Sequence, residues 1–260
     1  MLYIINTLLI EFGIDVRKLF LAIKGGGVYV KNFFAFKKMN KNGEFLLRRI
    51  RPCLSDRYDQ SGSANGHYFH QDLMVAQKVF ENKPEKHIDF GSRVDGFIAH
   101  VASFRKIEVF DVRSLKTTSK NITFTQVDIV DVPEMYYNYS ESLSCLHTLE
   151  HIGLGRYGDS IDPGGHIKAL DSLVKIVKKG GTLYISFPIG TQRIEFDAHR
   201  VFSVRYALKM FKDAGLTLSN FSYVNDSGVL KFVNLDKIST QDIDNNLNCE
   251  YGCGIFELKK

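Results

Sequence analysis

Three aspartates stand near the carboxyl ends of three short apolar runs in the middle of the chain. The runs are HIDF, KIEVFDV and ITFTQVDI, which carry Asp89, Asp111 and Asp128. Gly91 and Ser92 follow the first run directly, and an apolar pattern at helical spacing begins just after them. Glycine at such a junction lets the backbone approach a ligand closely, because it has no side chain. A strand, a glycine turn and a helix in this order predict a ligand at the carboxyl edge of an open sheet.

The second and third runs indicate what that ligand contains. Asp111 comes twenty residues after Gly91, a position from which a carboxylate can accept hydrogen bonds from both ribose hydroxyls of an adenosine. Asp128 and Ile129 end the third run, where they can receive an adenine amino group and cover the apolar face of the ring. The three run ends therefore predict a site for adenosine.

The glycine turn argues against a diphosphate in the same ligand. Gly91 and Gly96 do not form the GxGxxG pattern that binds a pyrophosphate. Asp89 would repel a diphosphate but could pair, directly or through water, with an ammonium group. A cofactor with adenosine at one end and an amino acid at the other fits these residues better.

Only a parallel sheet brings these residues together. From about residue 86 onward, apolar runs alternate with helical patterns, which is typical of strands joined by crossover helices. We expect an α/β fold with a Rossmann-like, mostly parallel sheet of seven strands and an N-terminal helical extension. Strands are predicted at residues 87–90, 106–112, 122–129, 142–148, 182–189, 216–224 and 254–260, with an extra edge strand within 229–235. Helices are predicted at 94–104, 166–179 and 203–215, the last two ended by Gly180 and Gly215.

The N-terminal quarter of the chain is strongly basic. Residues 1–51 hold ten Lys and Arg against three acidic residues, a net charge of +7 that leaves −2 for the rest of the chain. We expect a basic helical segment at 1–65, interrupted by Gly25-Gly26-Gly27, and a main domain at 66–260. Two interpretations stay open: a helical arm packed on the main domain, or a peripheral contact with an anionic membrane surface. Nucleic acid is not expected, because no reader motif accompanies the charge.

Cysteine usage favours a reduced, cytoplasmic setting, with the inner face of the membrane as an alternative. The four cysteines are too few and too scattered for a disulfide framework. The first ten residues are too short to cross a bilayer and lack a cleavage site for a signal peptide. A homodimer is left open.

Six motifs, in order, resemble the class I S-adenosylmethionine-dependent methyltransferases over residues 86–260. They are DFGS, FDV, VDI, SLSCLHTLEHIG, KKGGTLYISFP and DAHRVFS. More narrowly, GHYFHQDLMVA, LHTLEHIGLGRYGD and FPIGTQRIEFDAHRVF are similar to an uncharacterised bacterial branch found among genes for surface polysaccharides. Ser92 and the short link after the second strand depart from the broader family's pattern.

The resemblance implies S-adenosylmethionine as cofactor and assigns its contacts. Gly91 and Ser92 would border the methionine part, Asp111 the ribose, and Asp128 and Ile129 the adenine. The complete set of predicted cofactor contacts is Asp89, Gly91, Ser92, Asp111, Asp128, Ile129, Leu146, Tyr68 and His70. The last two lie in a segment that would close over the site as a lid or, alternatively, pin a helix to the sheet.

Methyl transfer from a sulfonium needs a positioned acceptor and, for a hydroxyl acceptor, a base. His147 is expected beside the sulfonium as that base, with His199 and Glu195 as alternatives. The resemblance implies O-methylation of a sugar or of a phosphorylated or nucleotide-linked precursor of a surface polysaccharide. Arginine suits phosphate recognition, and the predicted acceptor contacts are Arg156, Arg193 and Arg200.

No metal is expected, and two other functional classes compete with the methyltransferase prediction. Clustered acidic and histidine residues at 150–151 and 195–199 lack the spacing of a known metal site, so no metal is expected. A nicotinamide-dependent oxidoreductase also uses an acidic second strand, but the absent GxGxxG counts against it. A catalytically silent, methyltransferase-like binding protein stays open, because cofactor binding and turnover use different residues.

Overall fold

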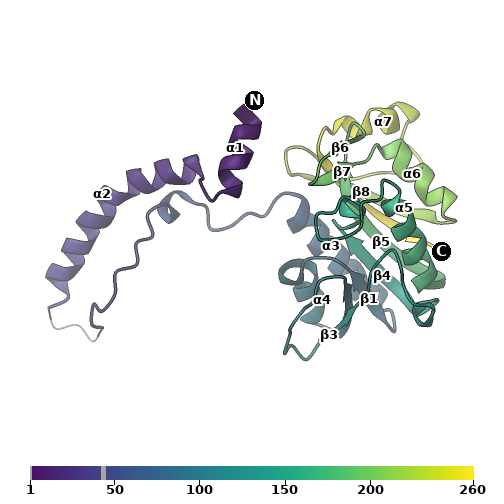
Figure 1. Cartoon of the computed structure of the whole chain (residues 1–260), viewed down its shortest axis with the longest axis horizontal. Helices are drawn as coiled ribbons and strands as arrows, with labels where there is room; N and C mark the ends of the chain where they lie inside the picture. The colour runs from purple at the N-terminus through teal and green to yellow at the C-terminus, as the bar shows by residue number, and fades with distance from the viewer. Residues whose placement is uncertain (1, 42–44) are drawn as a thin grey trace. The chain divides into compact units, whose positions relative to one another are not determined.

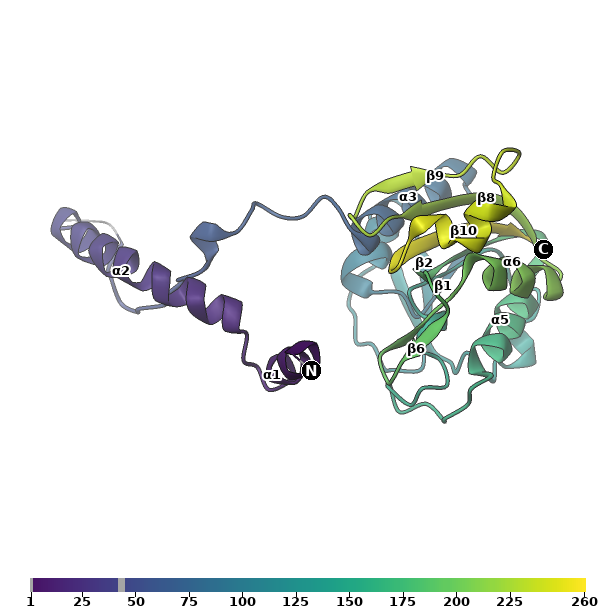
Figure 2. The same cartoon turned by 90° about the horizontal axis from the view of Figure 1, so that it is seen from above.

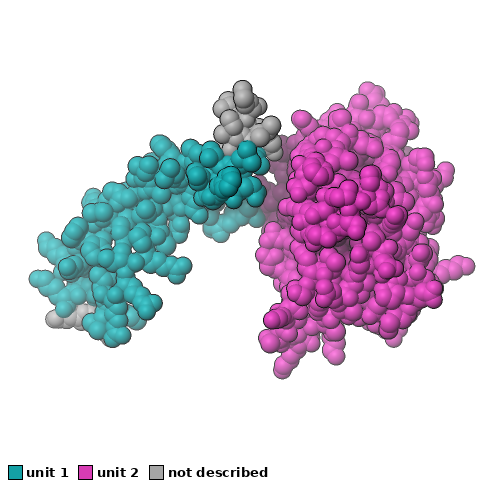
Figure 3. Space-filling model, in the orientation of Figure 1, with its two compact units in different colours: residues 1–63 teal, residues 64–260 magenta. Residues whose placement is uncertain are grey.

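The computed structural model describes residues 2–41 and 45–260. Met1 and residues 42–44 belong to the basic segment predicted from the sequence and lie outside the described residues. The chain divides into two compact units, residues 1–63 and residues 64–260 (Figure 3). None of the described helices is long and apolar enough to cross a membrane.

The first unit is built on two helices, α1 (Leu2–Glu11) and α2 (Val16–Met39). Asp15 caps α2 by accepting a hydrogen bond from the Lys18 backbone amide. The predicted break at Gly25-Gly26-Gly27 is wrong, because α2 runs through all three glycines. A Cβ at Gly25 would lie 1.8 Å from the Leu54 carbonyl oxygen, so this glycine serves the close approach of the following segment to the helix.

The second unit contains an eight-stranded sheet in the order β3-β2-β1-β4-β5-β10-β8-β9 (Figures 1 and 2). The strands are β1 (His87–Phe90), β2 (Ile107–Asp111), β3 (Ile122–Gln126), β4 (Ser140–Leu146), β5 (Val177–Ile189), β8 (Thr217–Val224), β9 (Leu230–Phe232) and β10 (Gly252–Lys259). The five strands from β3 to β5 pair in parallel, and β10 pairs antiparallel with both β5 and β8. The predicted α/β fold class is confirmed, with the extra edge strand present as β9.

Helices cover both faces of this sheet (Figure 1). They are α3 (His67–Asn82), α4 (Ala99–Ala102), α5 (Gly165–Ile176) and α6 (Val204–Asp213), with a short α7 (Thr240–Asp244) near the last strand. One apolar core joins α5 and α6 to the sheet, and a second joins α3, α4 and the helical turn before α4 to the opposite face. Strands covered on both faces are buried throughout, as all four residues of β1 are.

Several predicted boundaries differ from the structure, most clearly the junction between α5 and β5. The pattern at 166–179 predicts a helix that ends at Gly180, whereas α5 ends at Ile176 and Val177 already begins β5. The carbonyls of Lys175 and Ile176 accept hydrogen bonds at 2.7 and 2.8 Å from the backbone amides of Asn138 and Tyr139. These contacts satisfy two carbonyls of the last helical turn and let the chain extend from there.

The direction of the strands places the candidate residues at one edge of the sheet. Parallel pairing brings the carboxyl ends of β1, β2, β3 and β4 to one edge of the sheet. β10 runs the other way, so its first residues pair with the last residues of β5 at this same edge. A small hairpin, β6 (Arg193–Glu195) and β7 (His199–Val201), follows β5. Residues 112–121, the short link between β2 and β3, are all described and form no helix.

Candidate functional site

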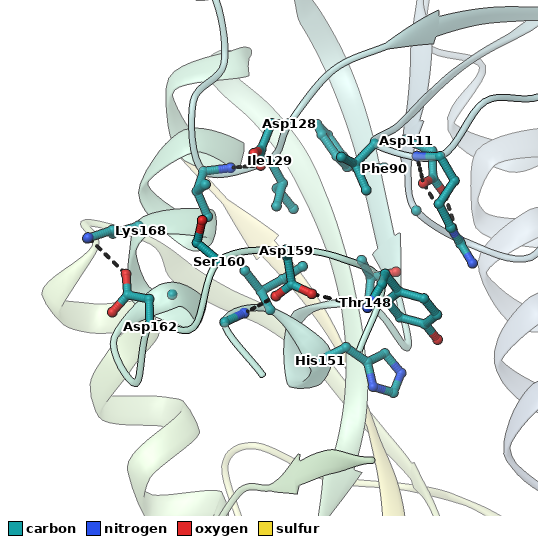
Figure 4. Close-up of a pocket in the computed structure, with 18 of the residues that line it drawn as sticks. Phe90, Asp111, Asp128, Ile129, Thr148, His151, Asp159, Ser160, Asp162 and Lys168 are labelled. Atoms are coloured by element: carbon teal, nitrogen blue, oxygen red, sulfur yellow. Dashed lines mark hydrogen bonds and ion pairs between the residues drawn. The ribbon is translucent and has the colours of Figure 1, made fainter. Parts of the chain in front are cut away.

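A cavity of about 270 Å³ opens at the carboxyl edge of the sheet (Figure 4). It is formed by the ends of β1 to β4 together with the loop that leads from β4 to α5. Its walls include Phe90, Gly91, Asp111, Arg113, Asp128, Ile129, His147, Thr148, His151, Tyr157, Asp159 and Asp162. The cavity is close to the lower end of the range for small-molecule sites.

Gly91 forms the wall between the ends of β1 and β4. Its φ is +75°, a conformation that disfavours other residues. A Cβ there would lie 2.5 Å from the Thr148 Cγ2 atom. The Gly91 amide donates to the Phe110 carbonyl at 2.9 Å, which fixes the turn against β2. Glycine is therefore required here both by conformation and by space.

Asp111 presents its carboxylate to the cavity and is held by Arg113. The guanidinium of Arg113 donates to both carboxylate oxygens, at 3.0 and 2.7 Å, and the Arg113 backbone amide donates at 2.8 Å. The same guanidinium lies 4.6 Å from the centre of the Tyr157 ring. This bidentate pair fixes the orientation of the carboxylate at the wall.

Asp128 and Ile129 form the wall beyond Asp111. One carboxylate oxygen of Asp128 accepts a hydrogen bond from the Val130 amide at 3.0 Å, which closes a tight turn after β3. The Ile129 side chain is buried in the core and also borders the cavity. Five residues predicted from the sequence thus line one cavity: Gly91, Asp111, Asp128, Ile129 and His147.

His147 and Glu150 form a buried pair at the cavity wall. The His147 Nδ1 atom lies 2.6 Å from the Glu150 Oε1 atom, and their side chains are 5% and 1% exposed. Burial lowers the pKa of His147, but the neighbouring Cys253 and the Glu150 carboxylate outweigh burial and raise it well above the ordinary value. Burial raises the pKa of Glu150, yet His147 reverses this and lowers it. The His147 Nε2 atom is buried and makes no hydrogen bond within the described part of the chain.

Aromatic rings surround this pair on the side of α3. The rings of His67 and Tyr68 lie 5.4 and 4.8 Å from the His147 ring, measured between centroids. Tyr251 lies between His67 and His199, at 5.4 and 5.3 Å. The His199 Nε2 atom is 3.5 Å from a Glu195 carboxylate oxygen on the β6–β7 hairpin. The three candidate bases therefore gather at this edge, but only His147 borders the cavity.

Asp89 is not where the sequence analysis expected it. Its carboxyl group is fully buried beneath the turn and does not border the cavity. It accepts hydrogen bonds from the Ser92 amide at 2.9 Å and contacts the hydroxyls of Ser92 and Ser144 at 2.6 and 2.5 Å. Burial raises the pKa of Asp89 to about 7. Because of this burial, Asp89 cannot pair directly with a ligand ammonium group, as the sequence had suggested. Asp89 and Ser92 instead stabilise the turn from the side that faces away from the cavity.

Other predicted cofactor contacts also lie away from the cavity. Leu146 is buried in the core against α3. His70 borders a separate surface depression with Leu73 and Phe232. Tyr68 packs on His147 and lies beneath the Arg93 guanidinium, at 5.2 Å from the ring centre. Of the two predicted lid residues, only Tyr68 is therefore next to the site.

The three arginines predicted to bind an acceptor already have protein partners. Arg200 is buried, and its guanidinium donates to carbonyls of the loop after β4. Arg193 pairs with Glu195 at 2.8 Å. Arg156 donates to the Ala198 carbonyl at 3.0 Å but stays exposed. Arg200 was predicted to bind an acceptor, but its guanidinium is buried and donates instead to backbone carbonyls of the loop that forms the cavity wall.

Sequence reasoning missed two residues next to His147. Ligand-type atoms of His67, His147 and Cys253 lie within 4.8 Å of one another, as one group among the described residues. His67 and Cys253 are 186 positions apart, on different elements, so no local spacing could have paired them. It also missed the loop residues Tyr157, Asp159 and Asp162, which close the cavity opposite the strand ends.

Comparison with known proteins places the fold. A search of curated proteins finds no matching sequence. Similar solved structures include the [4+2]-cyclase SpnF, with a TM-score of 0.52 and 12% identity over 77% of this chain and 85% of that one. A putative sarcosine dimethylglycine methyltransferase from Galdieria sulphuraria has a TM-score of 0.52 and 12% identity over 74% and 85%. Geranyl diphosphate methyltransferase in complex with SAM has a TM-score of 0.50 and 8% identity over 72% and 84%.

At such low identity these structures show a shared fold, that of class I methyltransferases. In sequence, the profile of a family described as "Caenorhabditis protein of unknown function, DUF268" matches residues 99–241. That span contains the ends of β2, β3 and β4 and the whole loop that closes the cavity. The chain therefore belongs to the DUF268 family, whose description names no activity.

Proposed function

We propose that this protein is an S-adenosylmethionine-dependent methyltransferase whose cofactor occupies the cavity at the carboxyl edge of the sheet. One observation carries the proposal: Gly91, Asp111, Asp128 and Ile129, from the ends of three neighbouring strands, border one cavity in the order that an adenosine-containing ligand requires. In this proposal Gly91 faces the methionine part, Asp111 the ribose, and Asp128 with Ile129 the adenine.

The reaction needs little more than alignment. An acceptor atom attacks the methyl carbon, the carbon–sulfur bond breaks, and S-adenosylhomocysteine leaves with the electron pair on sulfur. A hydroxyl acceptor must also lose its proton, and His147 is the candidate base that borders the cavity. Its Nδ1 atom is bound to Glu150, so Nε2 is the nitrogen that would take the proton. Because Cys253 and Glu150 raise the pKa of His147, this role requires the neutral ring, which becomes populated only at higher pH.

The acceptor we propose is a hydroxyl on a sugar, free or carried on a phosphate or nucleotide, of the kind used to build bacterial surface polysaccharides. Its support is the sequence resemblance described above, together with the exposed Arg156 guanidinium near Tyr157 at the rim. Nucleotide sugars, free sugars, phosphorylated small molecules and catechols should be screened for transfer of a labelled methyl group. Turnover with catechols or proteins alone would refute this acceptor class.

Calorimetry tests the cofactor assignment directly. We expect S-adenosylmethionine and S-adenosylhomocysteine to bind in the low micromolar range, about −7 to −8 kcal/mol, and NAD to bind far more weakly. Binding of NAD in preference to both would identify a nicotinamide-dependent protein. Tight cofactor binding without transfer to any acceptor class would instead favour a catalytically silent binding protein.

A further inference from the structure

His67, His147 and Cys253 come from three rigid elements that meet at the carboxyl edge of the sheet. His67 is the first residue of α3, His147 directly follows β4, and Cys253 is the second residue of β10. Their ligand-type atoms all lie within 4.8 Å of one another. Two imidazoles and one sulfur in such a group are a donor set that divalent transition metals prefer.

Two features of the His147 ring are common in metal-binding histidines. Its Nε2 atom is buried and makes no hydrogen bond with any described residue. Such a nitrogen carries a desolvation cost unless something binds it. Its Nδ1 atom is held at 2.6 Å by the buried Glu150 carboxylate. A carboxylate on the opposite ring nitrogen is the usual support that fixes the tautomer and orientation of a metal-binding histidine.

The centroid separation of the two rings is compatible with a shared metal, but their orientation would have to change. The centroids of the His67 and His147 rings are 5.4 Å apart and the ring planes are nearly parallel, at 8°, so at least one ring must rotate for both to point at one ion. Two imidazoles bound through nitrogen to one tetrahedral zinc ion place their centroids about 5 Å apart. Donor atoms in such a site are about 3.3 to 3.7 Å from each other, so side-chain shifts of roughly 1 Å would close the group around an ion.

The Cys253 thiol makes only weak contacts with oxygen atoms and also neighbours His147. Its side chain is fully buried, and the oxygen atoms next to its sulfur, Gln71 Oε1 and the Gly254 carbonyl oxygen, are both 3.7 Å away. Contacts of that length are weak for a thiol donor. Its strand is held on both sides, by β5 and by β8, so the sulfur has a fixed place.

We propose that His67, His147 through Nε2, and Cys253 bind one divalent transition-metal ion, with zinc the expected occupant. The thiolate and imidazole donors favour zinc over magnesium or calcium, which prefer oxygen. Three protein ligands leave the fourth tetrahedral position open, as in catalytic rather than structural zinc sites.

The open position gives the metal a role that rests on the proposed methyl transfer. Because His147 borders the cofactor cavity, the ion would lie at its wall, next to where an acceptor hydroxyl must approach. A hydroxyl bound to zinc loses its proton more readily, and this proton would pass to solvent. In the metal-loaded protein His147 then acts as a ligand, and the metal replaces it in activating the acceptor.

The test uses the full-length protein, stripped with chelator and reloaded with Zn²⁺ or Co²⁺. We expect one equivalent of zinc per chain by elemental analysis, and a thiolate-to-cobalt charge-transfer band with Co²⁺. Cys253→Ala, His147→Ala and His67→Ala should each lower metal affinity at least tenfold, and Cys253→Ala should abolish the band.

Matched controls separate ligation from damage to the fold. Cys249→Ala removes another buried cysteine four residues earlier, and His70→Ala removes the next histidine of α3; both should keep full loading. Less than 0.1 equivalent of zinc in the native protein, no charge-transfer band, or equal losses in the controls would overturn the proposal. Calorimetry with S-adenosylhomocysteine on the same samples reports separately on the methyltransferase assignment, which can fail while the metal site stands.

Discussion

Asp111 offers a test of the adenosine site at the scale of a single residue. We expect Asp111→Ala to weaken S-adenosylhomocysteine binding by about 1.5 to 3 kcal/mol, because charge-assisted hydrogen bonds to the ribose are lost. Calorimetry measures the loss directly. A 2′-deoxyribose analogue of the ligand, which lacks one of the two hydroxyls, should be affected less by the substitution.

Arg113 provides the control, because removing Asp111 also breaks its bidentate ion pair. Arg113→Ala breaks the same pair but keeps the carboxylate, so its affinity should stay within a few fold of the native value. Unchanged affinity in a folded Asp111→Ala protein would remove the adenosine assignment. An equal loss in both variants would attribute the effect to the ion pair instead.

Asp89 predicts a pH dependence of stability. Burial raises its pKa from 3.8 to about 7. Between pH 4 and pH 7 the Asp89 carboxyl is protonated in the folded protein but ionised in the unfolded chain. The free energy of unfolding therefore falls as the pH rises through this range, and the contribution of Asp89 that is present below pH 4 is lost by about pH 7. Relative to Asp89→Asn, the native protein should lose roughly 2 to 4 kcal/mol of unfolding free energy between pH 4 and pH 8. Denaturant titrations at several pH values measure this, and parallel pH profiles for the two proteins would contradict it.

Asp111 and Asp89 show how far single residues can be assigned from sequence. Asp111 could be placed, because a strand end in a parallel sheet determines which edge a side chain reaches. Asp89 could not, because its carboxyl points beneath the turn toward Ser144, a partner on a strand 55 positions later. The approach of His67 and Cys253 to His147 likewise depends on how α3 and β10 pack, which no local pattern encodes.

At the scale of elements, the loop between β4 and α5 depends on one buried arginine. The Arg200 guanidinium donates to the carbonyls of Ile152 at 2.6 Å and of Pro163 at 3.2 Å, from the two ends of the loop. Arg200→Ala should lower the unfolding free energy by about 2 to 4 kcal/mol, because buried carbonyls lose charged donors. S-adenosylhomocysteine should also bind several-fold more weakly, since Ile152 lines the cavity.

Arg156→Ala is the matched control for this prediction. Arg156 belongs to the same loop, but its side chain is exposed. Arg156→Ala should therefore lower the free energy of unfolding by less than about 1 kcal/mol. Thermal and denaturant unfolding of both variants, with calorimetry for the ligand, provides the comparison. Equal unfolding free energies for Arg200→Ala and the native protein would show that the loop keeps its conformation without Arg200.

Element types followed from periodicity, whereas some boundaries did not. Alternating apolar runs and helical stretches predicted the parallel sheet, since central strands such as β1 and β4 are buried on both faces. The end of α5 was missed because amides of Asn138 and Tyr139, distant in sequence, decide where the helix stops. The glycines of α2 were misjudged for a similar reason. Gly25 is needed because the Leu54 backbone packs against it, and this contact cannot be read from the neighbouring residues in the helix.

For the whole molecule, a vesicle experiment can decide whether the basic first unit contacts an anionic membrane surface or is a helical arm packed on the main domain. In α2, Leu19, Phe20, Ile23 and Phe34 share one helical face and are each more than half exposed. Lysines near such a face contribute about 1 kcal/mol each at an anionic surface. The protein should therefore sediment with phosphatidylserine-containing vesicles, and less so as salt increases.

A triple variant, Lys31→Gln, Lys37→Gln and Lys38→Gln, should weaken vesicle binding by about 100-fold. Its control carries the same change of charge on the second unit, at Lys175, Lys179 and Lys212, and should bind like the native protein. Sedimentation at several lipid concentrations measures both. If the native protein does not sediment with anionic vesicles, a helical arm packed on the main domain becomes the better interpretation.

The position of β10 in the sheet has a consequence for how the protein is made. This strand is the last of the sheet in chain order, yet it lies between β5 and β8. The residues that line the cavity end at Lys168, whereas Arg200, which holds the loop at its wall, comes later in the chain. Cys253 arrives only with β10, and the β8–β9 hairpin has no neighbour in the sheet until β10 is inserted. Biosynthesis therefore supplies the cavity residues and Arg200 before Cys253, so the proposed set of metal ligands is completed only with the last strand of the sheet.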